Sequence, residues 1–86
     1  MGMIETRVVV KDSTTPANGG AFIRTARFYN NAGTVQIYDL QTDYTSKSVV
    51  GWDATIGVTG NTLLVLVTGD VSDTLIWQST TRIIQL

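Results

Sequence analysis

Residues 51–86 read GWDATIGVTGNTLLVLVTGDVSDTLIWQSTTRIIQL, and this stretch decides the fold class. Short runs of alternating apolar and polar residues are separated by two glycine-containing segments, Thr59–Asn61 and Gly69–Asp73. A period of two indicates β-strands, and glycine beside Asn or Asp supplies the backbone angles of tight turns. We therefore expect three antiparallel strands here, with Trp52 near the start of the first and Trp77 in the last.

The middle strand of this stretch, Leu63–Val67, is apolar on both faces. Such a strand either lies inside a sheet and is covered from both sides, or has one face covered by another subunit. The final strand, Thr74–Leu86, also carries isoleucines on its second face. We expect a homo-oligomer whose interface uses one of two apolar pairs, Leu64 with Leu66 or Ile76 with Ile84.

The N-terminal half of the chain also reads as strands. The predicted elements, in chain order, are a strand over Met3–Lys11, a loop over Asp12–Gly20, a strand over Ala21–Tyr29, a turn over Asn30–Gly33 and a strand over Thr34–Leu40. The next segment, Gln41–Ser48, is polar, and we expect a surface connection there with Tyr44 as its one large apolar group.

Together these segments predict one all-β domain over residues 1–86, an antiparallel β-sandwich of jelly-roll-like form with about six to seven strands. Thr, Val and Ile make up 31 of the 86 residues, and β-branched side chains suit a pleated surface. The opening Met1-Gly2 looks like an addition ahead of a native start at Met3.

Composition narrows the classes of function. The chain has neither cysteine nor histidine, which removes disulfides, thiolate sites and the commonest metal ligand and general base. Six basic and seven acidic residues are scattered without a run of one sign, which argues against nucleic acid or an anionic membrane as partner. No apolar run is long enough for membrane insertion. We expect no catalytic residues, no metal and no cofactor.

A chain this short buries a modest core, so a stabilising device is needed. Without disulfides or metal, oligomerisation is the remaining common device, which independently favours a homo-oligomer. Arg24 stands among apolar residues of its strand and has two explanations. It either pairs inward with a carboxylate such as Asp53 across a subunit interface, or lies at a strand end and reaches water along its alkyl stem.

The remaining candidates also have two interpretations each. Trp52 and Trp77 are favoured as core residues whose indole N–H groups bond backbone carbonyls, against a role in stacking on sugars. The carboxylate pairs Asp39 with Asp43 and Asp70 with Asp73 suggest turns in which aspartate bonds its own backbone, rather than acid–base or Ca²⁺ chemistry. Tyr44 either pins its own segment or, with Asp43, contacts a ligand such as a sugar.

Several features together carry a resemblance to a known family. They are a Gly-Gly-Ala-Phe entry, an arginine-rich second strand, an Asn/Gly turn, a Gly-Trp-Asp strand, Gly-Asn and Gly-Asp turns, and a final Trp-x-x-x-Thr strand. From about Ala21 to Leu86 the chain resembles a small β domain of phage tail-fibre and related virion structural proteins. That resemblance implies a virion component made in the host cytoplasm, a trimer, contacts with other virion proteins, and no catalytic residues.

Two hypotheses follow. The first is a non-enzymatic virion module for the tail fibre, decoration or host attachment. The second is a carbohydrate-binding β-sandwich that uses Tyr44 and an exposed tryptophan, with a host-surface glycan as ligand. A monomeric state would count against the first, and glycan binding that depends on Tyr44 would favour the second.

Overall fold

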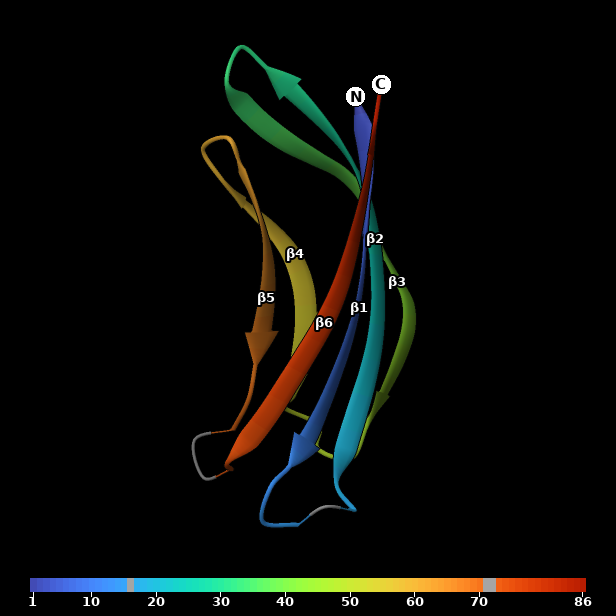
Figure 1. Ribbon diagram of the computed structural model, residues 1–86, viewed down its shortest axis with the longest axis vertical. Coiled ribbons are helices and arrows are strands. Elements are labelled where there is room, and N and C mark those ends of the chain that lie inside the picture. Colours follow the sequence, from blue (N-terminus) through green and yellow to red (C-terminus); the bar gives the residue numbers. More distant parts are fainter. Residues whose placement is uncertain (16, 71–72) are drawn as a thin grey trace.

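The fold is built from two antiparallel sheets that face each other (Figure 1). The computed structural model describes residues 1–15, 17–70 and 73–86, and within these ranges the chain forms strands and no helix. The strands are β1 (Gly2–Asp12), β2 (Gly19–Asn31), β3 (Thr34–Lys47), β4 (Asp53–Thr59), β5 (Thr62–Thr68) and β6 (Leu75–Gln85). One sheet has the order β3-β2-β1-β6, and the other is the pair β4-β5. The prediction of an all-β antiparallel sandwich with about six to seven strands is confirmed, and the described residues form six.

The strand β1 is the spine of the larger sheet. It pairs with β2 on one side and with β6 on the other along nearly its whole length. Its inward residues are buried and its outward residues are mostly exposed, as the alternation in sequence predicts. It begins one residue earlier than expected, because Gly2 already pairs with Phe28. Only glycine fits at this position, since an added Cβ would come within 2.4 Å of the Phe28 ring.

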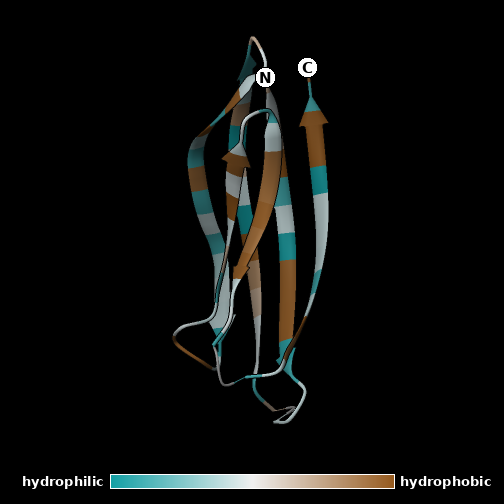
Figure 2. Cartoon of the chain, turned by 90° about the vertical axis from the view of Figure 1, so that its left-hand side faces the viewer, coloured by the Kyte–Doolittle hydropathy of each residue, from teal (hydrophilic) through white to brown (hydrophobic). Residues whose placement is uncertain are grey.

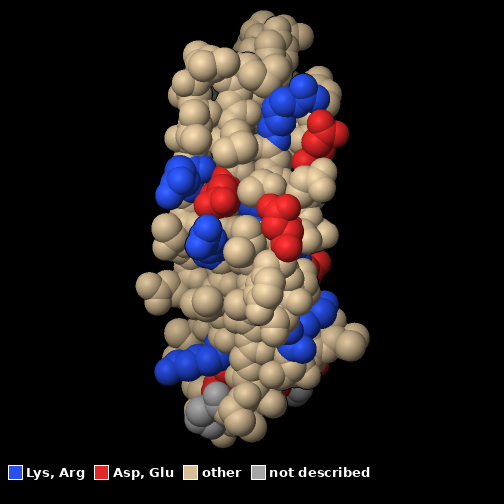
Figure 3. Space-filling view, turned by 90° about the vertical axis from the view of Figure 1, so that its right-hand side faces the viewer, with Lys and Arg blue, Asp and Glu red and all other residues tan. Residues whose placement is uncertain are grey.

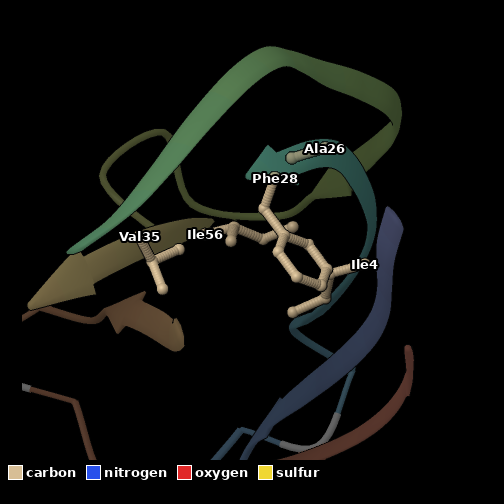
Figure 4. Close-up of a cluster of buried hydrophobic side chains, with 5 residues drawn as sticks. All are labelled: Ile4, Ala26, Phe28, Val35 and Ile56. Atoms are coloured by element: carbon tan, nitrogen blue, oxygen red, sulfur yellow. The ribbon is translucent and has the colours of Figure 1, made fainter. Parts of the chain in front are cut away.

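The core consists of two clusters between the sheets. The upper cluster, drawn in Figure 4, contains Ile4, Ala26, Phe28, Val35 and Ile56. The lower cluster contains Val8, Val10, Phe22, Trp52 and Ala54. Both clusters take residues from the larger sheet and from β4 or the residue before it, so the packing of β4 on β1 and β2 closes the sandwich.

The two tryptophans differ in burial. Trp52 is fully buried, and its Nε1–H donates to the Asp73 carboxylate at 3.1 Å, where a backbone carbonyl was predicted. Trp77 is half-buried and packs at the rim of the lower cluster. The interpretation as a core residue is confirmed for Trp52 and holds only in part for Trp77.

The guanidinium of Arg24 joins three strands. Arg24 is 3% exposed and lies between the sheets. Its Nε–H donates to Ala54 O at 2.8 Å, and Nη1 donates to Tyr44 O at 2.7 Å and to Ile23 O at 3.1 Å. Nη2 lies 3.3 Å from the Asp53 carboxylate. The pairing with Asp53 is therefore the correct explanation of this arginine, but it forms within one chain and not across a subunit interface.

The prediction that Gln41–Ser48 is a surface connection is wrong. β3 continues to Lys47 and stays paired with β2, with Tyr44 opposite Ile23 and Lys47 opposite Gly20. Ladder hydrogen bonds use the main chain, so an edge strand that is open to water tolerates polar side chains. Thr42, Tyr44 and Thr45 also have high strand propensity, which the polar composition of the segment hid.

The three-strand unit predicted for residues 51–86 is correct only for its first two strands. β4 and β5 form a hairpin, whereas β6 crosses to the other sheet and pairs with β1. The crossing places Leu75 and Trp77 against the lower cluster. β5 consequently lies at an edge, and the alternative in which Leu63–Val67 is central and covered from both sides is wrong.

The connections are partly as predicted. Ala32 and Gly33 both have positive φ in the turn between β2 and β3, as a two-residue hairpin loop requires. The predicted loop over 12–20 and turn over 69–73 include residues 16 and 71–72, which lie outside the described residues.

At the start of the 12–20 loop the Asp12 carboxylate accepts hydrogen bonds from Thr14 Oγ1 and from the Thr14 and Thr15 N–H groups. These hydrogen bonds lower the pKa of Asp12 below its ordinary value.

The buried tryptophan provides a first test of the core. Trp52→Ala should lower the free energy of unfolding by about 3–5 kcal/mol, because it removes the largest fully buried side chain and leaves a cavity in the core. Trp77→Ala should cost less, because that ring is only partly buried, at the rim of the lower cluster. Urea unfolding followed by circular dichroism measures both values, and equal losses would contradict the difference in burial.

Arg24 provides a second test. Arg24→Met should destabilise the fold by about 3 kcal/mol, because Ala54 O and Tyr44 O would lose their donor inside the sandwich. Asp53→Asn should cost under about 1 kcal/mol, because the Asp53 side chain is 58% exposed and water screens its ion pair. If the two variants unfolded at the same urea concentration, the carboxylate and not the carbonyls would be the important partner.

Candidate functional site

The outer face of the four-stranded sheet is the side turned away from β4 and β5. We use "outer face" for the outward residues of β1, β2, β3 and β6. Figure 3 looks onto this face, and charged side chains of both signs lie interspersed over it. Four of the six basic residues belong to it, namely Arg7, Lys11, Arg27 and Arg82. Glu5 lies beside Arg7 at 3.5 Å, so the face has no single sign of charge.

Three tyrosines give the outer face its aromatic character. Tyr29, Tyr38 and Tyr44 are each between 40% and 50% exposed. Tyr38 lies opposite Arg27, whose guanidinium is 5.2 Å from the centre of the Tyr38 ring. Tyr44 lies opposite Ile23, farther along the same strand. Exposed rings on one side of a sheet can stack on the apolar face of a sugar or pack on a protein partner.

Two irregularities in the β2–β3 pairing shape this region. The register shifts between Ile23 and Arg24 and again between Thr25 and Arg27. At the second shift Asp39 has φ of 54°, a conformation that aspartate tolerates better than most residues. Its carboxylate lies 3.2 Å from Arg27 Nη2, and the Asp43 carboxylate accepts from Thr25 Oγ1 at 2.7 Å. The prediction that Asp39 and Asp43 lie in turns is wrong, because both belong to β3 and both bond side chains of β2.

A shallow apolar hollow of about 630 Å³ lies at one end of the outer face. Met3, Arg27 and Ile84 contribute outward side chains to it, and the two chain ends lie beside it. Asp39 and Thr25 stand at its margin with β3. The hollow places Ile84, one of the predicted interface residues, beside the Arg27–Asp39 ion pair.

The second surface of interest is the uncovered inner side of β6. Figure 2 shows β6, which leads to the C-terminus, standing to one side of β4 and β5 with neither strand in front of it. Its residues 79, 81 and 83 point inward by register with β1 but remain exposed. Val67 of β5 also points toward the larger sheet and is 44% exposed. We call Val67, Ser79, Thr81 and Ile83 the open side of the sandwich.

The predicted interface residues do not form one patch. Leu64 and Leu66 lie on the outer surface of the β4–β5 pair, opposite Gly57 and Thr55. Ile76 and Ile84 lie on the outer face of the other sheet, eight residues apart and therefore roughly 27 Å apart along β6. Each of Leu66, Ile76 and Ile84 is about half exposed. Tyr44 and Asp43, the predicted ligand contacts, do lie on one face. Consecutive strand residues normally point to opposite faces, but Asp43 is the extra residue at a register shift and bonds Thr25 on the outer face.

The described residues hold no cluster of three or more acidic side chains that could bind a metal ion. Asp70 and Asp73 flank the residues at 71–72, and Asp73 is engaged by the Trp52 indole. In the part of the chain that the structure describes, no helix is long and apolar enough to cross a bilayer. The chemistry available on these surfaces is stacking, hydrogen bonding and apolar contact.

Sequence reasoning missed Tyr38, Arg27 and Ile83 as surface residues of interest. Tyr38 and Arg27 became neighbours through the β2–β3 register, and the Asn30–Gly33 turn could have given that pairing by simple counting. Ile83 shares a strand face with Trp77 and Leu75, and the sequence does not say whether a second sheet covers that face. Only the crossing of β6 to the larger sheet shows that this face is left open.

Comparison of the chain with known protein families, with curated proteins and with solved structures found no match in any of the three.

Proposed function

We propose that this chain is a non-enzymatic structural module that acts as a homo-oligomer in a phage virion, in the tail fibre, as decoration or in host attachment. The observation that supports assembly is the open side of the sandwich. A two-stranded sheet faces a four-stranded sheet, so β6 keeps an uncovered inner side. The virion part of the proposal rests on the sequence resemblance described above, which also implies a trimer.

Exposed apolar residues add to this support. Among the described residues, large hydrophobic side chains at least 38% exposed lie on β4, β5 and β6, namely Val58, Leu66, Val67, Ile76, Ile83 and Ile84. Single exposed apolar residues are normal, but a series along neighbouring strands is typical of contact surfaces. Pairing β6 or β5 with another chain would bury these residues and satisfy the backbone groups of a free edge.

The solution mass tests the assembly. We expect sedimentation equilibrium at low micromolar concentration to give a mass of at least two chains of 9.3 kDa, and of three chains for the implied trimer. A mass of one chain across the whole range would contradict the homo-oligomer. The genes that flank the reading frame test the virion assignment separately, because neighbours for tail or capsid proteins would support it and metabolic neighbours would not.

A second candidate function is carbohydrate binding on the outer face. It is favoured by the placement of Tyr38, Tyr44 and Asp43 on one side of the sheet, where the Arg27 guanidinium lies over the Tyr38 ring. The version that relied on an exposed tryptophan is wrong, because Trp52 is buried and Trp77 is half-buried in the core. A glycan could be the attachment target of a virion module, so the two functions are compatible.

A glycan array with the purified chain tests this candidate. If a glycan binds, Tyr44→Ala and Tyr38→Ala should each weaken binding by about ten-fold, or 1.4 kcal/mol, because each removes a stacking surface. Val50→Ala is the matched control, since Val50 is exposed on the connection between β3 and β4. Binding that survives both tyrosine changes would place the glycan elsewhere on the molecule.

A further inference from the structure

We infer that two copies of this chain pair through antiparallel β6 edges about a two-fold axis at Thr80, which joins their four-stranded sheets into one. This inference rests on the proposed homo-oligomer and names the surface that forms it. A two-fold contact closes at two chains, so it predicts a dimer in place of the trimer that the sequence resemblance implies. β6 is an edge strand, and no described strand pairs with its other side. Its ladder with β1 runs without a register shift from Gly2 to Asp12.

The edge of β6 lacks the usual protection against pairing. Natural edge strands are commonly blunted by proline, a bulge, lysine or a short length. β6 has eleven residues, no proline, no register shift and a single charge, at Arg82. The opposite edge strand, β3, is interrupted by two register shifts and carries Asp39, Asp43 and Lys47. Of these two edges, β6 is the one suited to another strand.

The hydrogen bonds at the ends of the β1–β6 ladder fix which backbone groups of β6 are free. Leu86 N–H donates to Met1 O at 3.0 Å, and Ser13 N–H donates to Thr74 O at 2.9 Å. Antiparallel ladders alternate between bonded and non-bonded pairs, so the even-numbered residues of β6 bond β1. The odd-numbered residues from 75 to 85 therefore direct their N–H and C=O groups away from β1, toward a new strand.

This alternation restricts the register of a second β6. Bonded pairs must join odd-numbered residues to odd-numbered residues, and the register centred on Thr80 does so. It pairs Ser79 with Thr81 of the second copy and forms about twelve backbone hydrogen bonds over the length of the strand. Thr80 then faces its own counterpart as a non-bonded pair, with the two Cα atoms about 4.5 Å apart.

The side chains of β6 are self-complementary about the same residue. On the outer face Ile76 lies opposite Ile84 of the second copy, and Gln78 lies opposite Arg82. On the inner face Trp77 lies opposite Ile83. Apolar residues thus meet apolar residues near both ends, and polar residues meet at the centre. Shifting the register by one residue pair in either direction removes the Ile76–Ile84 and Trp77–Ile83 contacts, so the centre at Thr80 is the favoured one.

The charges agree with this register. The two Arg82 side chains lie on opposite sides of the axis and each faces a neutral Gln78, so no like charges oppose each other. The exposed inner residues of the two β6 strands become neighbours and form a continuous floor between the two β4–β5 hairpins. Half-exposed Ile76, Ile83 and Ile84 each gain an apolar or aromatic neighbour.

Cysteine crosslinking tests both the pairing and its register, because the natural chain contains no cysteine. Under mild oxidation, Thr80→Cys should form a disulfide-linked dimer and double the mass of 9.3 kDa. The facing Cα atoms lie near the range that a disulfide spans. Gln78→Cys is the matched control on the same face. Its two copies would be roughly 14 Å apart along the strands, so oxidation should give no disulfide-linked dimer on a denaturing gel without reductant. An equal mixture of Gln78→Cys and Arg82→Cys should crosslink, because these residues oppose each other.

A proline variant provides the second measurement. The Ser79 N–H points away from β1, so Ser79→Pro should keep the β1–β6 ladder and weaken association at least ten-fold in sedimentation. If Thr80→Cys fails to crosslink while the mass shows an oligomer, this pairing is overturned and the homo-oligomer stands. If the unmodified chain is a monomer and none of the cysteine variants crosslinks, both proposals fail. Equal crosslinking of Thr80→Cys and Gln78→Cys reflects random collision and also overturns the register.

Discussion

The buried guanidinium of Arg24 is the interaction on which the joining of the two sheets depends. Its donors reach carbonyl oxygens of β2, β3 and of Ala54 in β4, so one side chain fixes the relative positions of three strands. A charge in this position is costly unless its donors are satisfied, and the carbonyls and Asp53 satisfy them. β4 is the strand that closes the core, and Arg24 sets where it docks. The apolar clusters above and below then pack against a strand whose position is already defined.

Closing the sandwich with only two strands has a consequence for the surface. β4 covers the larger sheet over the core clusters, β5 lies beside it at an edge, and β6 is left uncovered on its inner side. The 86 residues of the sequence supply no further strand to cover it within the described ranges. Because only two strands cover the larger sheet, β6 keeps an unpaired backbone edge and three half-exposed isoleucines. Under the proposed assembly, further copies of the chain would bury this surface.

Much of the fold could be predicted from the sequence, because alternation, turn residues and β-branched content act locally. The strands β1, β2, β4 and β5 and the turn at Asn30–Gly33 are confirmed to within two residues at most ends. The continuation of β3 was missed because it is held by main-chain bonds to β2, which side-chain polarity does not report. The crossing of β6 was missed because consecutive strands usually pair, and here the pairing with β1 is set by contacts far apart in the chain. For the surfaces, the structure places Tyr44 and Asp43 on the exposed outer face, and their ligand role stays a prediction. The pairing of Arg27 with Tyr38 on the same face depends on the β2–β3 register.

In the proposed dimer, the sequence of β6 serves two interfaces at once. The backbone N–H and C=O groups of its even-numbered residues bond β1, and those of its odd-numbered residues point away from β1. The fold of one chain therefore does not compete with the pairing of two β6 strands for the same hydrogen-bonding groups. The side chains follow a different rule, since they alternate between faces of the sheet and not between its edges. A pattern symmetric about Thr80 contributes nothing to pairing with β1, whose sequence is not symmetric. That symmetry has a physical use only where β6 meets another copy of itself, which is why we assign the assembly to this edge.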